Sequence, residues 1–226
     1  METEAKIAKA AKQHTVYKTS SGKRVPSVTT IIGVIAKPAL IPWANRLGLE
    51  GTVYEDYLKE SGKVGTLAHE MIQEDMGGPA FAWDRNAYTQ DQIDQAEISR
   101  KNFELWCKSK PSFNPEAIEV PLVSDSCGFG GRIDLLARID GDLWLIDFKT
   151  GKGIFPEMEV QVAAYNYLLD ESGYKIKGSR ILRFGRAEEG GFEDCVLSEG
   201  KIRAAWNVFE CALSLYRAKQ IHEKTK

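Results

Sequence analysis

Residues 128–150 constrain the fold of this chain more than any other stretch. Two apolar runs rich in Leu, Ile and Trp are joined there by Asp140 and Gly141, and each run carries one acidic residue within it, Asp134 and Asp147. An Asp-Gly pair between apolar runs is a strong local signal for a hairpin with a tight turn. We therefore predict that the two runs are paired β-strands.

The charged side chains of this predicted hairpin indicate a functional site. Side chains alternate across a strand, so Asp147 and Lys149 are expected on one face and Phe148 on the other. Charges buried within apolar strands cost several kcal/mol unless they are paired or hold a metal. Carboxylates suit Mg²⁺ and Mn²⁺, which can bind a phosphodiester and activate water. We predict a metal-dependent hydrolytic site; charges near a turn or structural ion pairs are the competing interpretation.

Length and composition are those of an ordinary globular protein. The chain has 226 residues, of which 43% are hydrophobic and 27% charged, and no apolar run approaches the length needed to span a bilayer. We predict one domain with three parts: a basic arm with a hairpin (residues 1–25), a helical region (26–110) and an α/β core (115–220). The first residues lack an apolar signal core, which predicts a cytoplasmic location.

The cysteines argue against a sulfur-ligated metal. The four residues, Cys107, Cys127, Cys195 and Cys211, are far apart and form no CxxC pair. Zinc knuckles and iron–sulfur clusters need closely spaced cysteines. Reduced cysteines are therefore expected.

Charge is distributed unevenly along the chain. The net charge is −2, yet residues 1–49 carry eight Lys or Arg and two acids. A basic end on an acidic protein is typical of a segment that binds a polyanion such as nucleic acid, and it is also compatible with a solvated face.

The periodicity of apolar residues predicts the element order. A small hairpin is expected around residues 20–22, with Ser27 as the N-cap of the helix that follows. Further helices are predicted at 39–57 (with a break near 48–51), 64–76, 92–108, 157–169 and 201–219, and strands at 117–123, 130–139, 143–148, 179–184 and 192–197. Residues 4–14 are helix-prone, and the tail from Ile221 is expected to be frayed. This order predicts a mixed α/β sheet flanked by helices.

Two further residues are candidates for the site. Glu119 lies on the first predicted strand of the core, beside the strand of Asp134. His69 lies on the predicted helix at 64–76, and a lone histidine on a helix is more often exposed or hydrogen-bonded than a ligand. From the residues alone, a ligand role for His69 stays the minority interpretation.

Five short motifs in order resemble the PD-(D/E)XK nuclease superfamily, specifically its RecB-like branch. They are PSVT (26–29), GTLAHE (65–70), GRID (131–134), DFKT (147–150) and QVAAY (161–165). Their order is similar to that in the mitochondrial genome-maintenance exonuclease and related phage and bacterial proteins. A single short motif is weak evidence for a family, whereas a series of motifs in the expected order is strong evidence. The resemblance implies a restriction-endonuclease-like core.

The resemblance also implies residue roles. His69, Asp134, Asp147 and the main-chain carbonyl of Phe148 would ligate Mg²⁺ or Mn²⁺, with Glu119 as an additional acid. Lys149 would be catalytic, and the iron–sulfur cysteines of some relatives are absent. Asp147 stands where many relatives have Glu, which the family pattern allows. Gln161 and Tyr165, one helical turn apart, would contact DNA and organise the catalytic residues. The basic residues expected to meet DNA are Lys23, Arg24, Lys37, Arg46 and Arg132.

The resulting hypothesis is a Mg²⁺- or Mn²⁺-dependent exonuclease acting on single-stranded DNA ends, in a bacterium or a phage-infected cell, with recombination or replication proteins as possible partners. Two alternatives stay open. One is a DNA-binding module on a nuclease fold without turnover, and the other is a structure-specific endonuclease for flaps or junctions.

Overall fold

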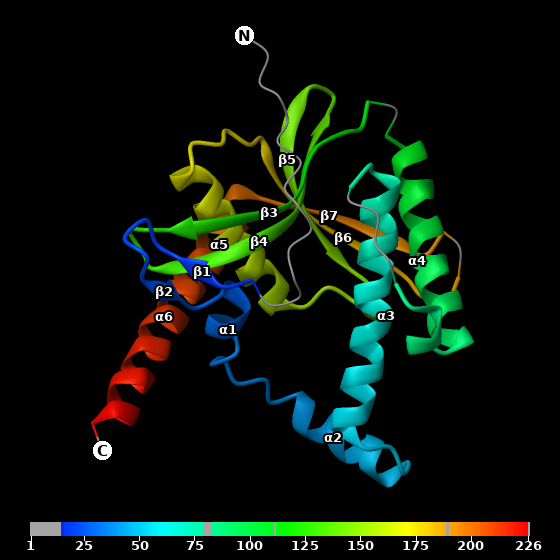
Figure 1. The fold of residues 1–226 in the computed structure, drawn as a ribbon, viewed down its shortest axis with the longest axis horizontal. Helices are drawn as coiled ribbons and strands as arrows, with labels where there is room; N and C mark the ends of the chain where they lie inside the picture. The colour runs from blue at the N-terminus through cyan, green and yellow to red at the C-terminus, as the bar shows by residue number, and fades with distance from the viewer. Residues whose placement is uncertain (1–14, 79–82, 111, 189, 226) are drawn as a thin grey trace.

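Five strands form one mixed sheet at the centre of the molecule (Figure 1). The computed structural model describes residues 15–78, 83–110, 112–188 and 190–225, and its strand order is β3-β4-β5-β6-β7. Neighbouring strands are antiparallel except β5 and β6, which are parallel and are joined through helix α5 (Pro156–Glu171). The strands are β3 (Asn114–Ser124), β4 (Phe129–Ile139), β5 (Asp142–Lys149), β6 (Gly178–Phe184) and β7 (Phe192–Leu197). The expected mixed sheet and the Asp140-Gly141 hairpin are confirmed.

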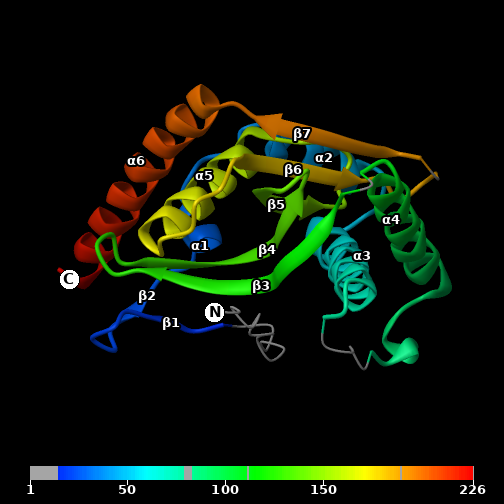
Figure 2. The same ribbon diagram turned by 90° about the horizontal axis from the view of Figure 1, so that it is seen from above.

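Helices cover both faces of the sheet (Figures 1 and 2). On one face, α1 (Val28–Ile32), α5 and α6 (Glu199–Lys224) enclose a core that includes Ile133, Leu145 and Phe209. On the other face, α3 (Tyr54–Asp75) and α4 (Gln90–Lys108) enclose a second core that includes Trp106 and Phe148. The sheet is therefore the middle layer of three, as expected for apolar strands buried on both sides.

The segment before the sheet folds against β4. Strands β1 (Tyr17–Lys18) and β2 (Arg24–Val25) form the predicted hairpin, and the side chain of Ser27 caps α1 by accepting from the backbone N–H of Thr30. The Tyr17 ring lies on Gly130, where a Cβ would come within 2.5 Å of it. The hairpin is thus held close to the strand that carries Asp134. The helix expected at residues 4–14 lies outside the described residues.

Two helix boundaries differ from the prediction. Helix α2 (Leu40–Leu49) ends before Gly51, which adopts a left-handed φ of +78°, and α3 then runs unbroken from Tyr54 to Asp75. The helix predicted at 64–76 is present, but its predicted start was wrong, because α3 begins at Tyr54 and continues through Gly62. One glycine costs a helix only about 1 kcal/mol, and the packing of the buried residues that follow it outweighs that cost. Helix α6 likewise continues to Lys224, so the fraying expected from Ile221 was also wrong. A short 3₁₀ helix, η1 (Arg85–Ala87), precedes α4.

Within the described ranges, no helix combines the length and the apolar character that crossing a membrane requires.

Candidate active site

Three carboxylates lie in one row across adjacent strands. Strands β3 and β4 are paired on both sides of Glu119 and Asp134, which places these two residues opposite each other. The pairing of β4 with β5 ends at Leu135 and Ile146, so the next position of the same register places Asp134 opposite Asp147. The sheet opens at this row because regular pairing of β4 with β5 stops there.

The backbone is irregular where the carboxylates lie. Glu119 has a φ of +53°, a conformation that costs a non-glycine residue about 1–3 kcal/mol. In β4, Ile133 and Leu135 are two residues apart yet belong to cores on opposite faces, so the alternation breaks at Asp134. The Asp134 Oδ2 atom accepts a hydrogen bond of 2.8 Å from the backbone N–H of Phe148 on β5. Its carboxylate therefore lies between the strands, where a ladder bond would otherwise run.

Asp147 and Lys149 project from the same side of β5, as predicted. The Lys149 ammonium forms an ion pair with Asp147 Oδ2, while Phe148 points into the core on the opposite face. Asp147 is fully buried, with 0% of its surface exposed, and its Oδ1 atom has no hydrogen-bond partner among the described residues. A buried carboxylate oxygen without a partner is costly, and such an atom calls for an explanation.

The structure brings His69 to this row from α3, far away in sequence. Its ring packs edge-on against the Phe148 ring, with 5.9 Å between centroids. Burial, and then the nearby Lys149 ammonium, lowers the pKa of His69 to about 4. The imidazole is therefore neutral at pH 7, the form that can ligate a cation.

The acids share an environment that disfavours negative charge. Burial raises the pKa of Asp147 to about 6, against the opposing effect of Lys149. Burial, and then the charge of Asp134, raises the pKa of Glu119 to about 7. Burial also raises the pKa of Asp134 and brings that of Glu70 to about 7. Because the pKa values of these carboxyl groups are raised, a nearby cation would stabilise their ionised forms.

The donor atoms fit a hard divalent cation by their chemistry. Among residues 15–78, 83–110, 112–188 and 190–225, no group of three or more His, Cys, Asp or Glu side chains is already arranged as a metal site. The lone Oδ1 atom of Asp147, the neighbouring carboxylate of Asp134 and the neutral imidazole of His69 are nevertheless the ligand types that Mg²⁺ and Mn²⁺ accept. Lys149 provides the positive charge beside Asp147 in this arrangement.

Gln161 and Tyr165 lie over the same row from α5. The Gln161 side-chain amide donates to the Tyr165 hydroxyl at 2.8 Å, so the two share one helix face, as their spacing predicted. The Tyr165 ring covers Gly131, where a Cβ would come within 2.6 Å of it. Burial, and then the charges of Asp147 and Asp134, raises the pKa of Tyr165 well above its ordinary value. The pair is thus close to both acids.

The predicted basic residues do not form one patch. Arg132 lies within the site, where it forms an ion pair with Glu119. Lys37 forms an ion pair of 2.9 Å with Glu157 at the start of α5, and Arg46 lies on α2. The remaining two, Lys23 and Arg24, line a separate pocket.

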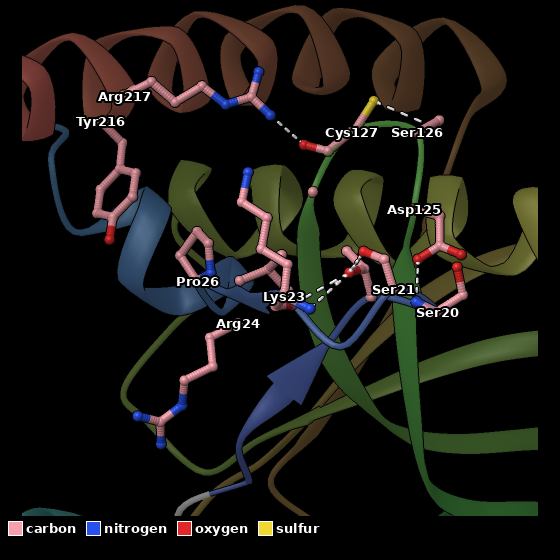
Figure 3. A pocket seen from close by; sticks show the side chains of 13 residues that line it. Ser20, Ser21, Lys23, Arg24, Pro26, Asp125, Ser126, Cys127, Tyr216 and Arg217 are labelled. Carbon is pink, nitrogen blue, oxygen red and sulfur yellow. Dashed lines mark hydrogen bonds between the residues drawn. The ribbon is translucent and has the colours of Figure 1, made fainter.

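The pocket that Lys23 and Arg24 line has a volume of about 430 Å³ and lies between the β1–β2 hairpin, the β3–β4 turn and α6 (Figure 3). The Lys23 ammonium points towards the α6 side, where Arg217 donates to the carbonyl of Cys127. The Arg24 guanidinium points away from Arg217. Asp125, the acid of this pocket, accepts from the backbone N–H of Ser20 at 2.8 Å.

Sequence reasoning missed three polar residues around the site. Gln73 donates to Glu119 at 2.6 Å, and its spacing of one helical turn from His69 could have indicated it. Glu70 has a buried carboxyl oxygen without a partner among the described residues, and it directly follows His69. Arg186, in the loop after β6, had no signal in the sequence because only tertiary packing brings it to α3 and the end of β5.

Comparison with known proteins identifies the family. A family model described as the PD-(D/E)XK nuclease superfamily matches residues 44–194. Since the match covers more than half of the 226 residues, the chain belongs to the PD-(D/E)XK nuclease superfamily. The five-stranded mixed sheet flanked by helices is the fold of that superfamily, as the sequence motifs predicted. No curated protein matches the chain.

Solved structures resemble the chain only distantly. A candidate exonuclease from Eubacterium rectale is 12% identical with a TM-score of 0.41, and the likeness covers 78% of this chain and 65% of that one. LHK-Exo, solved in complex with dAMP, is 13% identical with a TM-score of 0.34, covering 70% of this chain and 84% of that one. Likenesses at this level carry no weight on substrate or mechanism.

Proposed function

We propose that this protein is a divalent-metal-dependent deoxyribonuclease that degrades single-stranded DNA from its ends. Membership of the PD-(D/E)XK nuclease superfamily supports hydrolysis of phosphodiester bonds. The observation that carries the proposal is the row of Glu119, Asp134 and Asp147 across three strands, with Asp147 fully buried, Lys149 beside it and an unpartnered oxygen on Asp147. Placing several acids together in a partly buried site costs free energy and shifts their pKa values, and such shifts are typical of catalytic sites.

The residues that would hold Mg²⁺ or Mn²⁺ are His69, Asp134, Asp147 and the carbonyl of Phe148, with Glu119 as a further acid. When bound, the ion would lower the pKa of a water molecule and neutralise charge on the phosphate. Asp134 is oriented by the Phe148 N–H, and His69 is oriented by its contact with the Phe148 ring. Both groups are therefore held before a ligand arrives, which lowers the cost of assembling the site.

The protein's own groups would act on the phosphodiester as follows. Lys149 extends from β5 on the side of Asp147, where its ammonium can orient the attacking water or stabilise the negative charge that develops on the phosphate. Gln161 and Tyr165 fix each other through their hydrogen bond and would contact the strand from the α5 side. Arg132, held by Glu119, adds a positive charge at the other end of the row. Phosphates of the bound strand would be attracted to these cations.

A single digestion separates the proposal from its rivals. Linear and circular single strands carrying an internal label are incubated with the protein and Mn²⁺ or Mg²⁺, with EDTA as the control. Degradation of the linear strand alone is expected, because a closed circle offers no end. Cutting of circles would favour the structure-specific endonuclease, and binding of DNA with no product under any metal condition would favour a DNA-binding module without turnover.

A further inference from the structure

Arg186 is a cation held in place beside the acidic row. It lies in the loop between β6 and β7, and its guanidinium donates to two hydroxyl groups. The Nη1 atom is 3.1 Å from Ser61 Oγ on α3, and the Nη2 atom is 2.7 Å from Thr150 Oγ1 at the end of β5. Two elements of the site thus fix the direction of this side chain.

The positive charge of Arg186 has no carboxylate partner among the described residues. Hydroxyl groups accept hydrogen bonds without neutralising the charge, and the buried Nε atom has no partner in the described part of the chain. Burial lowers the pKa of Arg186. By contrast, Arg180 and Arg183 on the preceding strand are each paired with a carboxylate, at 2.7 and 3.1 Å. Burying an unpaired guanidinium costs free energy that an anionic ligand would recover.

The surroundings of Arg186 connect it to the proposed catalytic residues. Thr150 directly follows Lys149, and Ser61 lies on the helix that carries His69. A Cβ on Gly65, one turn before His69, would come within 3.2 Å of Thr150 Oγ1 and 3.3 Å of Arg186 Nη2. The absence of a side chain there lets α3, β5 and the guanidinium approach one another closely. The charge of Arg186 also contributes to lowering the pKa of His69.

We infer that Arg186 binds a backbone phosphate of the DNA strand next to the phosphodiester that is cut. The inference rests on the proposed nuclease function, since it assigns a ligand to one side of that site. A guanidinium whose position is fixed by two hydroxyls loses little conformational entropy on binding, and its fork geometry matches phosphate oxygens. The rival explanation is that Arg186 only ties α3 to β5.

The salt dependence of DNA binding separates these explanations. Binding of a labelled single strand is measured without divalent metal over a series of salt concentrations, for wild type, R186Q and R203Q. Each phosphate contact contributes about 0.7 to the slope of log affinity against log salt concentration for single strands. R186Q is expected to reduce the slope by about 0.7 and the affinity about tenfold at low salt. R203Q removes the same charge from an exposed position on α6 and is expected to leave both quantities unchanged.

A wild-type slope and affinity in folded R186Q would overturn the inference, whatever happens to its melting temperature, because a purely structural tie has no effect on counterion release. If R186Q does not fold, R186K replaces it: the charge stays, the fork geometry is lost, and an affinity at least about threefold weaker is expected with the wild-type slope. In that case, an R186K protein with the wild-type affinity would overturn the inference that Arg186 binds a phosphate. Cleavage by wild type, measured separately with Mn²⁺, shows whether the nuclease proposal itself has failed.

Discussion

Asp147 illustrates how a residue suited to chemistry can be poorly suited to stability. It is fully buried, one of its oxygens has no partner among the described residues, and its nearest compensation is the ammonium of Lys149. Burial raises its pKa from 3.8 to about 6. An acid whose pKa is raised in the folded state stabilises the fold only while it is protonated, so this carboxyl destabilises the metal-free protein at neutral pH.

This leads to a prediction for D147N in the absence of metal. Asparagine has nearly the same shape as aspartate, so the substitution removes the buried charge and leaves the packing in place. The Lys149 side chain, which is 18% exposed, can still reach water. D147N is expected to be more stable than wild type by about 1–2 kcal/mol at pH 7.5, with the difference disappearing as the pH falls below 4. Chemical denaturation at several pH values measures it, and D142N, at the exposed start of β5, is the control. A D147N protein less stable than wild type at pH 7.5 would contradict this account of Asp147.

At the scale of elements, the approach of α3 to the sheet decides whether His69 reaches the acids. Two glycines of α3 offer a matched test. At Gly62 a Cβ would meet no atom within 4 Å, whereas at Gly65 it would press on Thr150 and Arg186. The helix would gain stability from alanine at either position, by about 1 kcal/mol, but only Gly65 faces a close neighbour.

We therefore expect G62A to raise the free energy of unfolding by about 0.5–1 kcal/mol and leave cleavage unchanged. G65A should lose this gain and lower the cleavage rate at least about tenfold, because displacing catalytic groups by a fraction of an ångström is costly. Melting temperature and single-turnover cleavage measured on both variants decide the matter. Equal activity of G62A and G65A would show that close packing at Gly65 has no bearing on the site.

Elements with a local signal could be predicted from sequence, and elements that depend on distant contacts could not. The Asp140-Gly141 turn, the Ser27 cap and the alternation at Asp147 and Lys149 are short-range features, and the structure contains all of them. The continuity of α3 through Gly62 was missed because a glycine lowers local helix propensity while tertiary packing overrides it.

The candidate site was predictable to the extent that its motifs are local. The acids Asp134 and Asp147 stand out because charged residues interrupt apolar strands, and His69 became a candidate only through the family resemblance. Arg186 could not be found in this way, since its neighbours Ser61 and Thr150 are far from it in sequence. The left-handed conformation of Glu119 had no sequence signal either, because glutamate is not a residue type that favours a positive φ.

At the scale of the whole molecule, basic groups lie both at the acidic row and in the pocket beside the β1–β2 hairpin (Figure 3). Lys23 and Arg24 have no ion-pair partner within the described ranges, and both line that pocket. If a bound strand extends from the site to this pocket, these residues would contact its phosphates. Such contacts would contribute to affinity and leave the cutting step itself unaffected.

The double variant K23Q/R24Q tests this path. We expect its affinity for single strands to fall and the slope of log affinity against log salt concentration to decrease by about 1.4 if both residues contact phosphates. The cleavage rate at saturating DNA should stay at the wild-type value, since neither residue is among the groups proposed to hold the cation or to act on the phosphodiester. Titrations at several salt concentrations, with R203Q as the control, give the answer. An unchanged slope would place the strand elsewhere on the molecule.

The central claim is that the acidic row and Lys149 together hydrolyse DNA with the help of a divalent cation. It is tested most directly by titrating Mn²⁺ into metal-free protein bound to an end-labelled single strand, with K149A and D134A as parallel samples. Wild type is predicted to release product only after Mn²⁺ is added, with a saturable dependence, whereas both variants bind the strand and cut at least about 10²-fold more slowly. Product formed by wild type in EDTA, or cleavage by K149A at the wild-type rate, would contradict the account.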